Sequence, residues 1–358
     1  MISKTFRKSW PGFLWILAAL LLLGYSLQTI YQWPSERGFY YNLQAIENGR
    51  WAWCAALLLM CLPAWRVFKR GFLFFLLALL ASVLLSRPLI QSARLTESLE
   101  REFITYKGSF SFSKWLFAQS ATINSKPIHL SIDTLRALYY SSSTSRASAV
   151  IVLLHGGGFY QGEPEWMSGL ASELANKGFD VITPSYPLQP NALFPNSSHV
   201  LLSHLNRWLD SIYSPSLKRP SLFFAGSSAG GTLAMNTAAI SKAKVSGVIA
   251  MYPISDFTKP MHSISDVPRM VKAYVENNQH RQASPVFTKI ELPLLLLHGT
   301  KDPIVPVNQS RAMYLNPNFS PKHYFELPWA THSFEYPIYG PSGQFAVQAI
   351  EAFIQEYQ

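Results

Sequence analysis

The chain has 358 residues, of which 49% are apolar, 14% aromatic and only 14% charged. Soluble globular proteins carry about 25% charged residues, so this composition excludes a disordered chain and argues against a protein that is soluble throughout. The net charge of +10 is concentrated in residues 1–110, which hold 12 Lys and Arg against 5 Asp and Glu, whereas residues 111–358 hold 18 against 15. Because basic residues commonly flank membrane segments, we expect a lipid bilayer and no nucleic acid as partner.

The first apolar run extends from Ser9 to Ser35 without a charged residue. About 20 apolar residues span a bilayer, so residues 11–31 are predicted to form a membrane span, preceded by basic residues within 4–8. A cleaved signal peptide is the alternative, but no small-residue cleavage site follows Leu27 and two further apolar stretches come soon after.

Two shorter apolar stretches, residues 51–65 and 71–86, follow. Arginine and lysine side chains at their edges can reach the membrane interface and lengthen both stretches, which predicts spans at about 48–66 and 71–90. A re-entrant or interfacial hairpin is the alternative. Basic clusters at 4–8 and 66–70 favour the cytoplasmic side. Three crossings then predict a multi-pass membrane protein whose catalytic domain lies outside the cytoplasm, and two crossings would reverse that side.

Beyond the predicted membrane region of residues 1–90, residues 91–125 are predicted to form a juxtamembrane helix or linker. Residues 126–358 alternate between strand-like and helix-like segments, beginning with the strand-like segment IHLSIDTLRALYY at 128–140 and the continuous apolar strand AVIVLL at 149–154. Such regular alternation predicts an α/β fold with a mostly parallel central sheet and helices on both faces.

A candidate nucleophile lies in the sequence Gly226-Ser227-Ser228-Ala229-Gly230, which matches G-x-S-x-G between a predicted strand and a predicted helix. In that context the sharp turn exposes the central serine above the sheet, and only glycine fits at the flanking positions. The pattern therefore predicts Ser228 as a catalytic nucleophile.

A glycine run, His155-Gly156-Gly157-Gly158, ends an earlier strand. It lacks the continuation expected of a nucleotide-binding loop. Together with Ser228, it indicates an oxyanion hole formed by the N–H groups of Gly157, Gly158 and Ala229, which would stabilise a carbonyl oxygen as it gains negative charge.

The base and its orienting acid are expected later in the chain, each after a strand. Asp302 follows the strand LPLLLLHG, and His332 follows the strand HYFELP. Histidine can take the serine proton and return it near neutral pH, while a carboxylate holds the required tautomer. Asp256 is the alternative acid and His323 the alternative base.

These segments resemble the α/β-hydrolase superfamily, specifically the esterase/lipase group that includes hormone-sensitive-lipase-like and feruloyl-esterase-like enzymes. The resemblance rests on LLHGGGFYQG, GSSAGG, MYPISD, LLLLHGTKDPIVP and LPWATHSF in this order, and it does not cover residues 1–90. It implies a serine esterase with the triad Ser228, Asp302 and His332. The short insertion after Asp256 suggests a small lid or an open pocket.

We therefore expect an α/β-hydrolase domain at 126–358, preceded by about three transmembrane helices, that cleaves small-molecule or lipid carboxylic esters through an acyl-enzyme intermediate. We expect no cofactor and no metal ion. A peptidase, amidase or acyltransferase remains open because the same triad serves all of them, and so does an inactive binding protein on the same fold.

Overall fold

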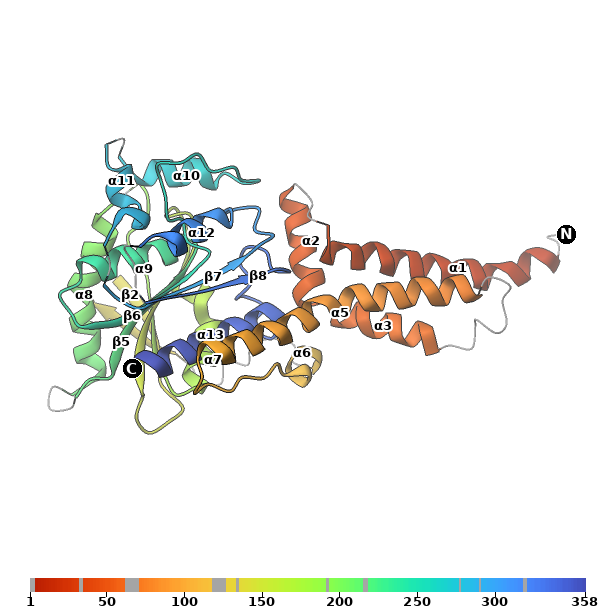
Figure 1. The fold of residues 1–358 in the computed structure, drawn as a ribbon, viewed down its shortest axis with the longest axis horizontal. Coiled ribbons are helices and arrows are strands. Elements are labelled where there is room, and N and C mark those ends of the chain that lie inside the picture. The colour runs from red at the N-terminus through yellow and green to blue at the C-terminus, as the bar shows by residue number, and fades with distance from the viewer. Residues whose placement is uncertain are drawn as a thin grey trace.

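The structure, a computed structural model, describes residues 4–31, 35–61, 71–117, 127–132, 135–190, 193–214, 218–276, 278–289, 291–317 and 321–358. An elongated bundle of apolar helices projects from a larger part in which helices cover a twisted sheet (Figure 1).

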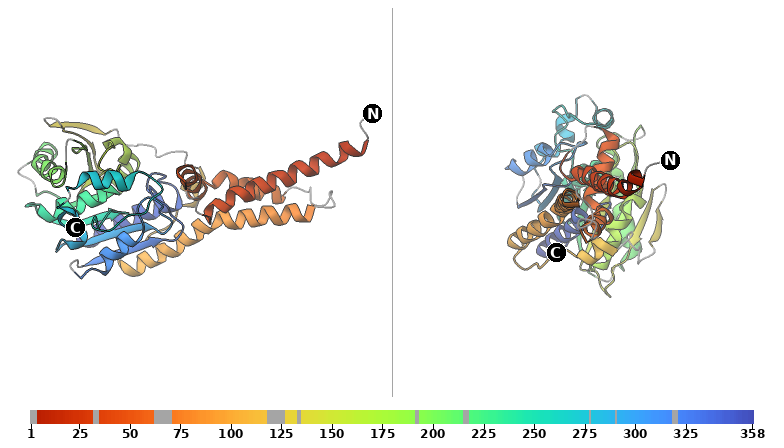
Figure 2. Two further views of the ribbon diagram at one scale, coloured as in Figure 1. Left: turned by 90° about the horizontal axis from the view of Figure 1, so that it is seen from above. Right: turned by 90° about the vertical axis from the view of Figure 1, so that its right-hand side faces the viewer.

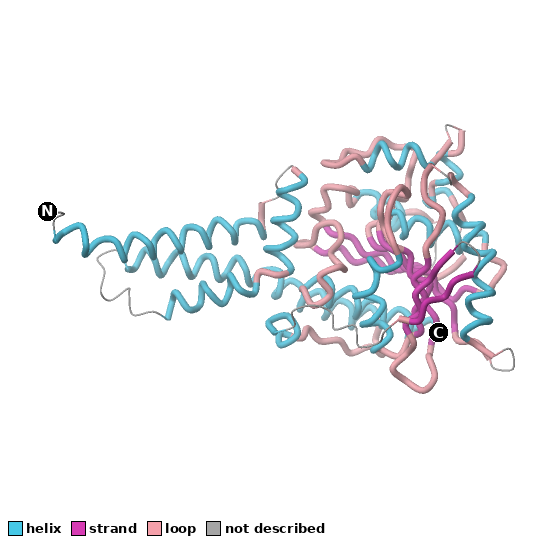
Figure 3. Tube along the Cα trace, turned by 180° about the vertical axis from the view of Figure 1, so that it is seen from behind, coloured by secondary structure: helices cyan, strands magenta, loops and turns pink. Residues whose placement is uncertain are grey.

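The bundle contains α1 (Lys4–Ser26), α3 (Arg50–Cys61) and the first half of α5 (Gly71–Glu102). These helices pack next to one another, as the different views show (Figures 1, 2 and 3). Their small shared core is formed by Ala19, Leu59, Phe74 and Ala78. Large apolar side chains point outward instead: Leu21 and Leu58 are each 67% exposed and Phe72 is 70% exposed. A soluble helix bundle would carry polar residues on this outer surface.

Among the described residues, one helix, Phe72–Glu102, is long and apolar enough to cross a membrane. Leu14–Thr29 and Arg50–Met60 are shorter apolar helices. At ~1.5 Å per residue, the described part of α3, Arg50–Cys61, extends about 18 Å, against a hydrocarbon core of ~30 Å. The predicted three crossings, and the multi-pass location that depends on them, are therefore not confirmed. The end of the predicted span 48–66 and the basic turn at 66–70 lie outside the described residues.

Helix α2 (Glu36–Glu47) lies across the base of the bundle, next to the sheet-containing part (Figure 1). Its N-terminus is capped by Ser35, which has extended backbone angles and whose side chain accepts a hydrogen bond from the amide of Gly38 (3.1 Å). The short 3-10 helix η1 (Leu27–Thr29) ends the first apolar segment on the same side.

Helix α5 continues without interruption from the bundle into the larger part (Figure 2, left). The hydroxyl of Ser92 donates to the carbonyl of Pro341 (3.0 Å), at the start of α13 (Pro341–Tyr357). Leu99 and Phe103 are buried in the same core as α13. Residues 91–102, predicted as a juxtamembrane helix or linker, thus form a helix that packs into the core. After it comes the short helix α6 (Phe112–Phe117). The domain boundaries stay predictions.

The central sheet has eight strands in the order β1-β2-β4-β3-β5-β6-β7-β8. Strands β1 and β2 pair antiparallel, β2 pairs antiparallel with β4, and all other neighbours run parallel. The mostly parallel sheet predicted from the sequence is confirmed. The strands are β1 (Ile128–Ile132), β2 (Leu135–Tyr140), β3 (Ala149–Leu154), β4 (Asp180–Pro184), β5 (Ser221–Ser227), β6 (Val245–Met251), β7 (Leu294–Gly299) and β8 (Lys322–Leu327).

Helices cover both faces of the sheet. Successive side chains of a strand point to opposite faces, and in the buried strands the side chains on both faces are apolar and pack against helices. Ile151 and Leu153 of β3 belong to the core shared with α5, α7 and α13. Val150 and Val152 belong to the core shared with α8, α9 and α12. The remaining helices are η2 (Pro164–Met167), α7 (Ser168–Asn176), α8 (Asn196–Ile212), α9 (Ala229–Ile240), α10 (Val267–Tyr274), α11 (His280–Ala283), η3 (Pro285–Phe287) and α12 (Asn308–Leu315).

Candidate active site

Ser228 lies in the sharp turn between β5 and α9. Its backbone has φ 54° and ψ −122°, a conformation that is strained for a residue with a side chain. The Ser228 amide donates to the carbonyl of Met251 (2.9 Å), which ties the turn to the end of the neighbouring strand β6. The serine is therefore held in one position at the carboxyl edge of the sheet.

The flanking glycines allow this turn to pack against its neighbours. A Cβ atom at Gly226 would lie 2.4 Å from the carbonyl oxygen of Gly230, and one at Gly230 would lie 2.3 Å from the carbonyl oxygen of Leu154. Atoms cannot approach this closely without displacing backbone, so both positions exclude a side chain. This is the steric reason for the G-x-S-x-G pattern.

The glycine run after β3 adopts left-handed backbone conformations, with φ 117° at Gly157 and 64° at Gly158. A Cβ atom at Gly156 would lie 3.3 Å from Cβ of Ser228, so two motifs distant in the sequence are adjacent in the fold. In the described part of the chain, the N–H groups of Gly157, Gly158 and Ala229 donate no hydrogen bond. They are free to bind an anionic oxygen.

His155 holds the start of this glycine loop. Burial lowers the pKa of His155 to about 4, so the imidazole is neutral at physiological pH. Its ring stacks on Tyr186 with the centroids 4.3 Å apart, and the Tyr186 hydroxyl donates to the His155 carbonyl (2.8 Å). These contacts give His155 and Tyr186 a positioning role in the loop.

Asp302 and His332, predicted from separate segments, form a hydrogen-bonded pair. Nδ1 of His332 donates to Oδ2 of Asp302 (2.7 Å). The other carboxylate oxygen accepts from the amides of Ile304 (2.8 Å) and Val305 (2.9 Å). Both side chains are largely buried, because the turns after β7 and β8 lie next to each other at the same edge of the sheet.

Asp302 is held in its ionised form. Burial alone would raise the pKa of the Asp302 carboxyl, but the charge of His332 and the hydrogen bonds from His298 and His332 outweigh it, and the pKa lies well below its ordinary value. His298 also donates from Nε2 to the Val305 carbonyl (2.9 Å), while its Nδ1 lies 2.7 Å from the Ser310 hydroxyl. His298 therefore orders the loop that carries Asp302.

The two alternatives lie apart from this pair. Asp256 accepts from the amide of Thr258 (2.9 Å) and faces Lys259 (3.6 Å). The ring nitrogens of His323 contact Glu102 Oε1 (2.6 Å) and the Tyr357 hydroxyl (2.7 Å). Neither residue forms a hydrogen bond with Ser228, Asp302 or His332 in the described part of the chain.

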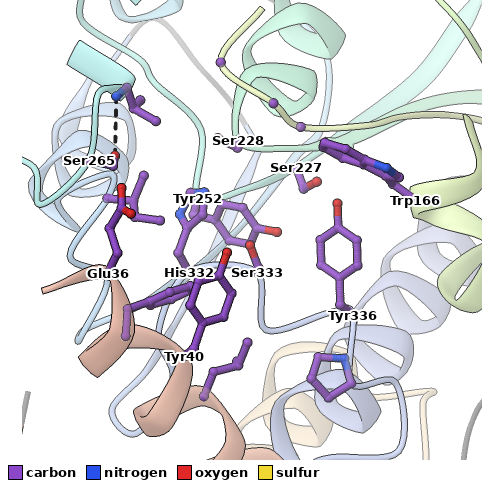
Figure 4. Close-up of a pocket in the computed structure, with 18 of the residues that line it drawn as sticks. Glu36, Tyr40, Trp166, Ser227, Ser228, Tyr252, Ser265, His332, Ser333 and Tyr336 are labelled. Atoms are coloured by element: carbon purple, nitrogen blue, oxygen red, sulfur yellow. Dashed lines mark hydrogen bonds between the residues drawn. The ribbon is translucent and has the colours of Figure 1, made fainter. Parts of the chain in front are cut away.

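A cleft of about 910 Å³ connects these groups (Figure 4). Ser228, His332 and the glycine loop line it, together with Trp166 and Tyr336. No hydrogen bond joins the Ser228 hydroxyl to His332 among the described residues. Such bonds are often long in the absence of substrate and tighten when it binds.

Sequence analysis missed two groups of residues at this cleft. One comprises Phe39, Tyr40 and Leu43 of α2, which form part of its wall. The other is Tyr252, which lines the cleft, with the buried Glu335 that interacts with it. Burial raises the pKa of both, and interactions with Tyr252 and Ser227 partly oppose the rise at Glu335.

The Tyr252 ring packs against His332, with the centroids 4.3 Å apart. Glu335 follows His332 by three residues, and that proximity is the only sign of it in the sequence. In the described part of the chain, no group of three or more His, Cys, Asp or Glu side chains is placed to hold a metal ion.

Comparison with known proteins supports the fold independently. Residues 151–336 match a protein family described as having the alpha/beta hydrolase fold. No curated protein sequence matches the chain.

Solved structures of similar fold include an esterase/lipase from an uncultured bacterium, with 17% identity and a TM-score of 0.58, covering 75% of this chain and 98% of its own. A Pyrobaculum calidifontis esterase has 21% identity and a TM-score of 0.57, covering 74% and 92%. An esterase from the bacterial hormone-sensitive lipase family has 18% identity and a TM-score of 0.57, covering 75% and 98%. At these identities the likeness concerns the fold.

Proposed function

The chain belongs to the α/β-hydrolase family, and we propose that it is a membrane-anchored serine hydrolase that cleaves carboxylic esters through an acyl-enzyme intermediate. The observation that carries this proposal is the geometry of one cleft. A serine in a strained strand-to-helix turn shares it with a buried, hydrogen-bonded histidine–aspartate pair. The esterases of similar fold are consistent with this chemistry.

In the proposed reaction, Ser228 Oγ attacks the ester carbonyl while His332 accepts the serine proton. Asp302 keeps the proton of the imidazole on Nδ1, which leaves Nε2 as the base, and it stabilises the imidazolium that forms. The N–H groups of Gly157, Gly158 and Ala229 bind the developing oxyanion.

The reaction continues when His332 returns the proton to the leaving alcohol as the bond between the carbonyl carbon and the alcohol oxygen breaks. A water molecule then attacks the acyl-enzyme in the same way and releases the acid. This scheme needs no group beyond the chain and water.

The test is activity-based labelling with a fluorophosphonate, followed by hydrolysis of p-nitrophenyl butyrate. Ser228→Ala is expected to abolish labelling and to lower kcat by about 10⁶-fold, as triad removal does in other serine hydrolases. A purified, folded variant that keeps more than a few per cent of wild-type activity would exclude Ser228 as the nucleophile. An adduct on Ser227 would assign the role to that neighbour.

The proposed membrane anchor is the bundle of α1, α3 and α5. Its support is the length and composition of Phe72–Glu102 and the exposed leucines on the outside of the bundle. With three crossings and basic residues at 4–8 and 66–70 on the cytoplasmic side, the catalytic domain lies outside the cytoplasm.

A further inference from the structure

Helix α2 contributes to the catalytic cleft although it belongs to the N-terminal region, outside the hydrolase domain. We propose that the substrate is an ester of a membrane amphiphile, whose hydrocarbon chain passes over α2 from the bilayer around the apolar bundle into the cleft. This inference rests on the proposed function and specifies its substrate class.

Part of the surface that α2 presents to the cleft is apolar. Phe39 and Leu43 are one helical turn apart, so they lie on the same face, and both line the cleft together with Tyr40. Phe39 and Tyr40 also contact each other, with ring centroids 5.2 Å apart. Figure 4 shows Tyr40 directed toward the same space as His332 and Tyr336. These three side chains can bind hydrocarbon, while Glu36 and Gln44 of the same helix add polar groups to the lining of the cleft.

Helix α2 is fixed in place by hydrogen bonds, unlike a mobile lid. At its C-terminal end, the buried carboxyl of Glu47 accepts from the amide of Ser342 (3.0 Å) in α13 and also hydrogen-bonds to the Ser342 hydroxyl. Just beyond it, Nη1 of Arg50 donates to the carbonyl of Trp115 (3.1 Å). The wall is therefore present before a substrate arrives, and an apolar chain meets a preformed surface.

Hydrogen bonds also connect α2 to the apolar bundle. Nδ2 of Asn42, in the middle of α2, donates to the carbonyls of Gln28 (2.6 Å) and Tyr31 (2.5 Å). Thr29 in turn donates from its hydroxyl to the carbonyl of Leu84 in α5 (3.2 Å). The helix that lines the cleft thus rests directly on the end of the proposed anchor, as Figure 1 shows.

The insertion that carries α10 also contributes apolar side chains to the cleft. Ile264, Val267 and Met270 line it, beside the polar Ser265 and Asp266. At about 910 Å³, the cleft lies near the upper end of the ~300–1,000 Å³ range of small-molecule sites. An acyl or alkyl chain can lie along these apolar side chains while its ester group reaches Ser228.

Tyr40 and Tyr41 provide a matched pair for the test. They are adjacent in α2 and are 63% and 62% exposed, but Tyr40 lines the cleft and Tyr41 does not. Full-length wild type, Tyr40→Glu and Tyr41→Glu are reconstituted in phosphatidylcholine vesicles. The kcat/KM for p-nitrophenyl palmitate is then divided by that for p-nitrophenyl butyrate.

Tyr40→Glu is expected to lower this ratio by about 30-fold, because a charge at the wall opposes burial of two or three methylene groups at ~0.8 kcal/mol each. Tyr41→Glu should leave the ratio as in wild type. Equal ratios in all three proteins, or a wild type that hydrolyses butyrate but not palmitate, would overturn the inference. Equal loss in both variants would also overturn it, because the effect would then come from charge near the membrane.

The entry route has its own measurement. The palmitate ester is placed either in the bilayer that holds the protein or in separate protein-free vesicles. Faster hydrolysis in the shared bilayer is expected, and equal initial rates would refute entry from the membrane. Absence of both fluorophosphonate labelling and butyrate hydrolysis would instead refute the proposed function. Labelled, butyrate-active protein that fails the palmitate tests would refute the substrate class alone.

Discussion

Replacing Glu47 with Gln tests the attachment of α2 to the hydrolase domain through its dependence on pH. Glu47 is fully buried at the end of α2, where its only hydrogen-bond partner among the described residues is Ser342. No lysine or arginine in the described part of the chain forms an ion pair with it. Burial raises the pKa of Glu47 from 4.5 to about 8, although the bonds from Ser342 partly oppose this.

The free energy of unfolding depends on pH because Glu47 binds its proton more tightly in the folded chain than in the unfolded chain. Between pH 4.5 and 8, the folded chain keeps the Glu47 proton while the unfolded chain releases it. The free energy of unfolding therefore decreases as the pH rises through this window. The stabilisation is fully present below pH 4.5 and lost above pH 8. A difference between pKa values of about 8 and 4.5 corresponds to at most about 5 kcal/mol, at ~1.4 kcal/mol per pH unit.

Glutamine has nearly the same shape but is neutral at every pH, so Glu47→Gln removes this dependence. Other titrating groups act equally in both proteins and cancel in the difference between their melting temperatures. We expect the Tm of the variant minus that of wild type to rise by roughly 5–10 °C from pH 5 to pH 9. The shift in Tm per kcal/mol becomes smaller as a chain becomes longer, and this range applies that trend to 358 residues.

The assay is thermal unfolding of both detergent-solubilised proteins at half-unit pH intervals. A Tm difference between variant and wild type that stays constant from pH 5 to pH 9 would refute the argument. Glu47 would then titrate alike in the folded and unfolded chains, and the difference would report only the exchange of a carboxyl for an amide at Ser342.

Two further predictions concern the acid and the topology. Asp302→Asn should lower kcat by about 10⁴-fold, because the amide favours the wrong tautomer of His332. Asp256→Asn should lower kcat by less than about tenfold. Hydrolysis of p-nitrophenyl butyrate measures both variants, and the opposite ranking would assign the acid role to Asp256. For the topology, we expect alkaline phosphatase fused after Gln358 to be active and green fluorescent protein fused after Gln358 to be dark, as for a C-terminus outside the cytoplasm. The reverse result would mean an even number of crossings and a cytoplasmic active site.

The link between α2 and the cleft also bears on how the chain can be studied. Removing residues 1–70 would delete one wall of the cleft together with Glu47 and Arg50, which hydrogen-bond to Ser342 and Trp115. Assays of substrate range therefore call for the full-length protein.

The features that could be predicted from the sequence are those whose physical cause is local. The turn around Ser228 requires glycine within two residues on either side, so a five-residue pattern identifies it. The alternation of apolar strands and amphipathic helices predicts a mostly parallel sheet, because only that arrangement buries both faces of each strand. Asp302 and His332 could be proposed because each follows a predicted strand, and parallel strands end at the same edge.

Only the tertiary structure decided which distant residues meet. It pairs His332 with Asp302 rather than Asp256, although both aspartates follow strands and are buried. It also brings α2 to the cleft through a hydrogen bond between residues 295 positions apart, Glu47 and Ser342. No short-range pattern encodes such a contact, because it depends on how whole helices pack. The candidate nucleophile is thus readable from its immediate neighbours, while the wall that α2 adds to the cleft arises from packing between distant parts of the chain.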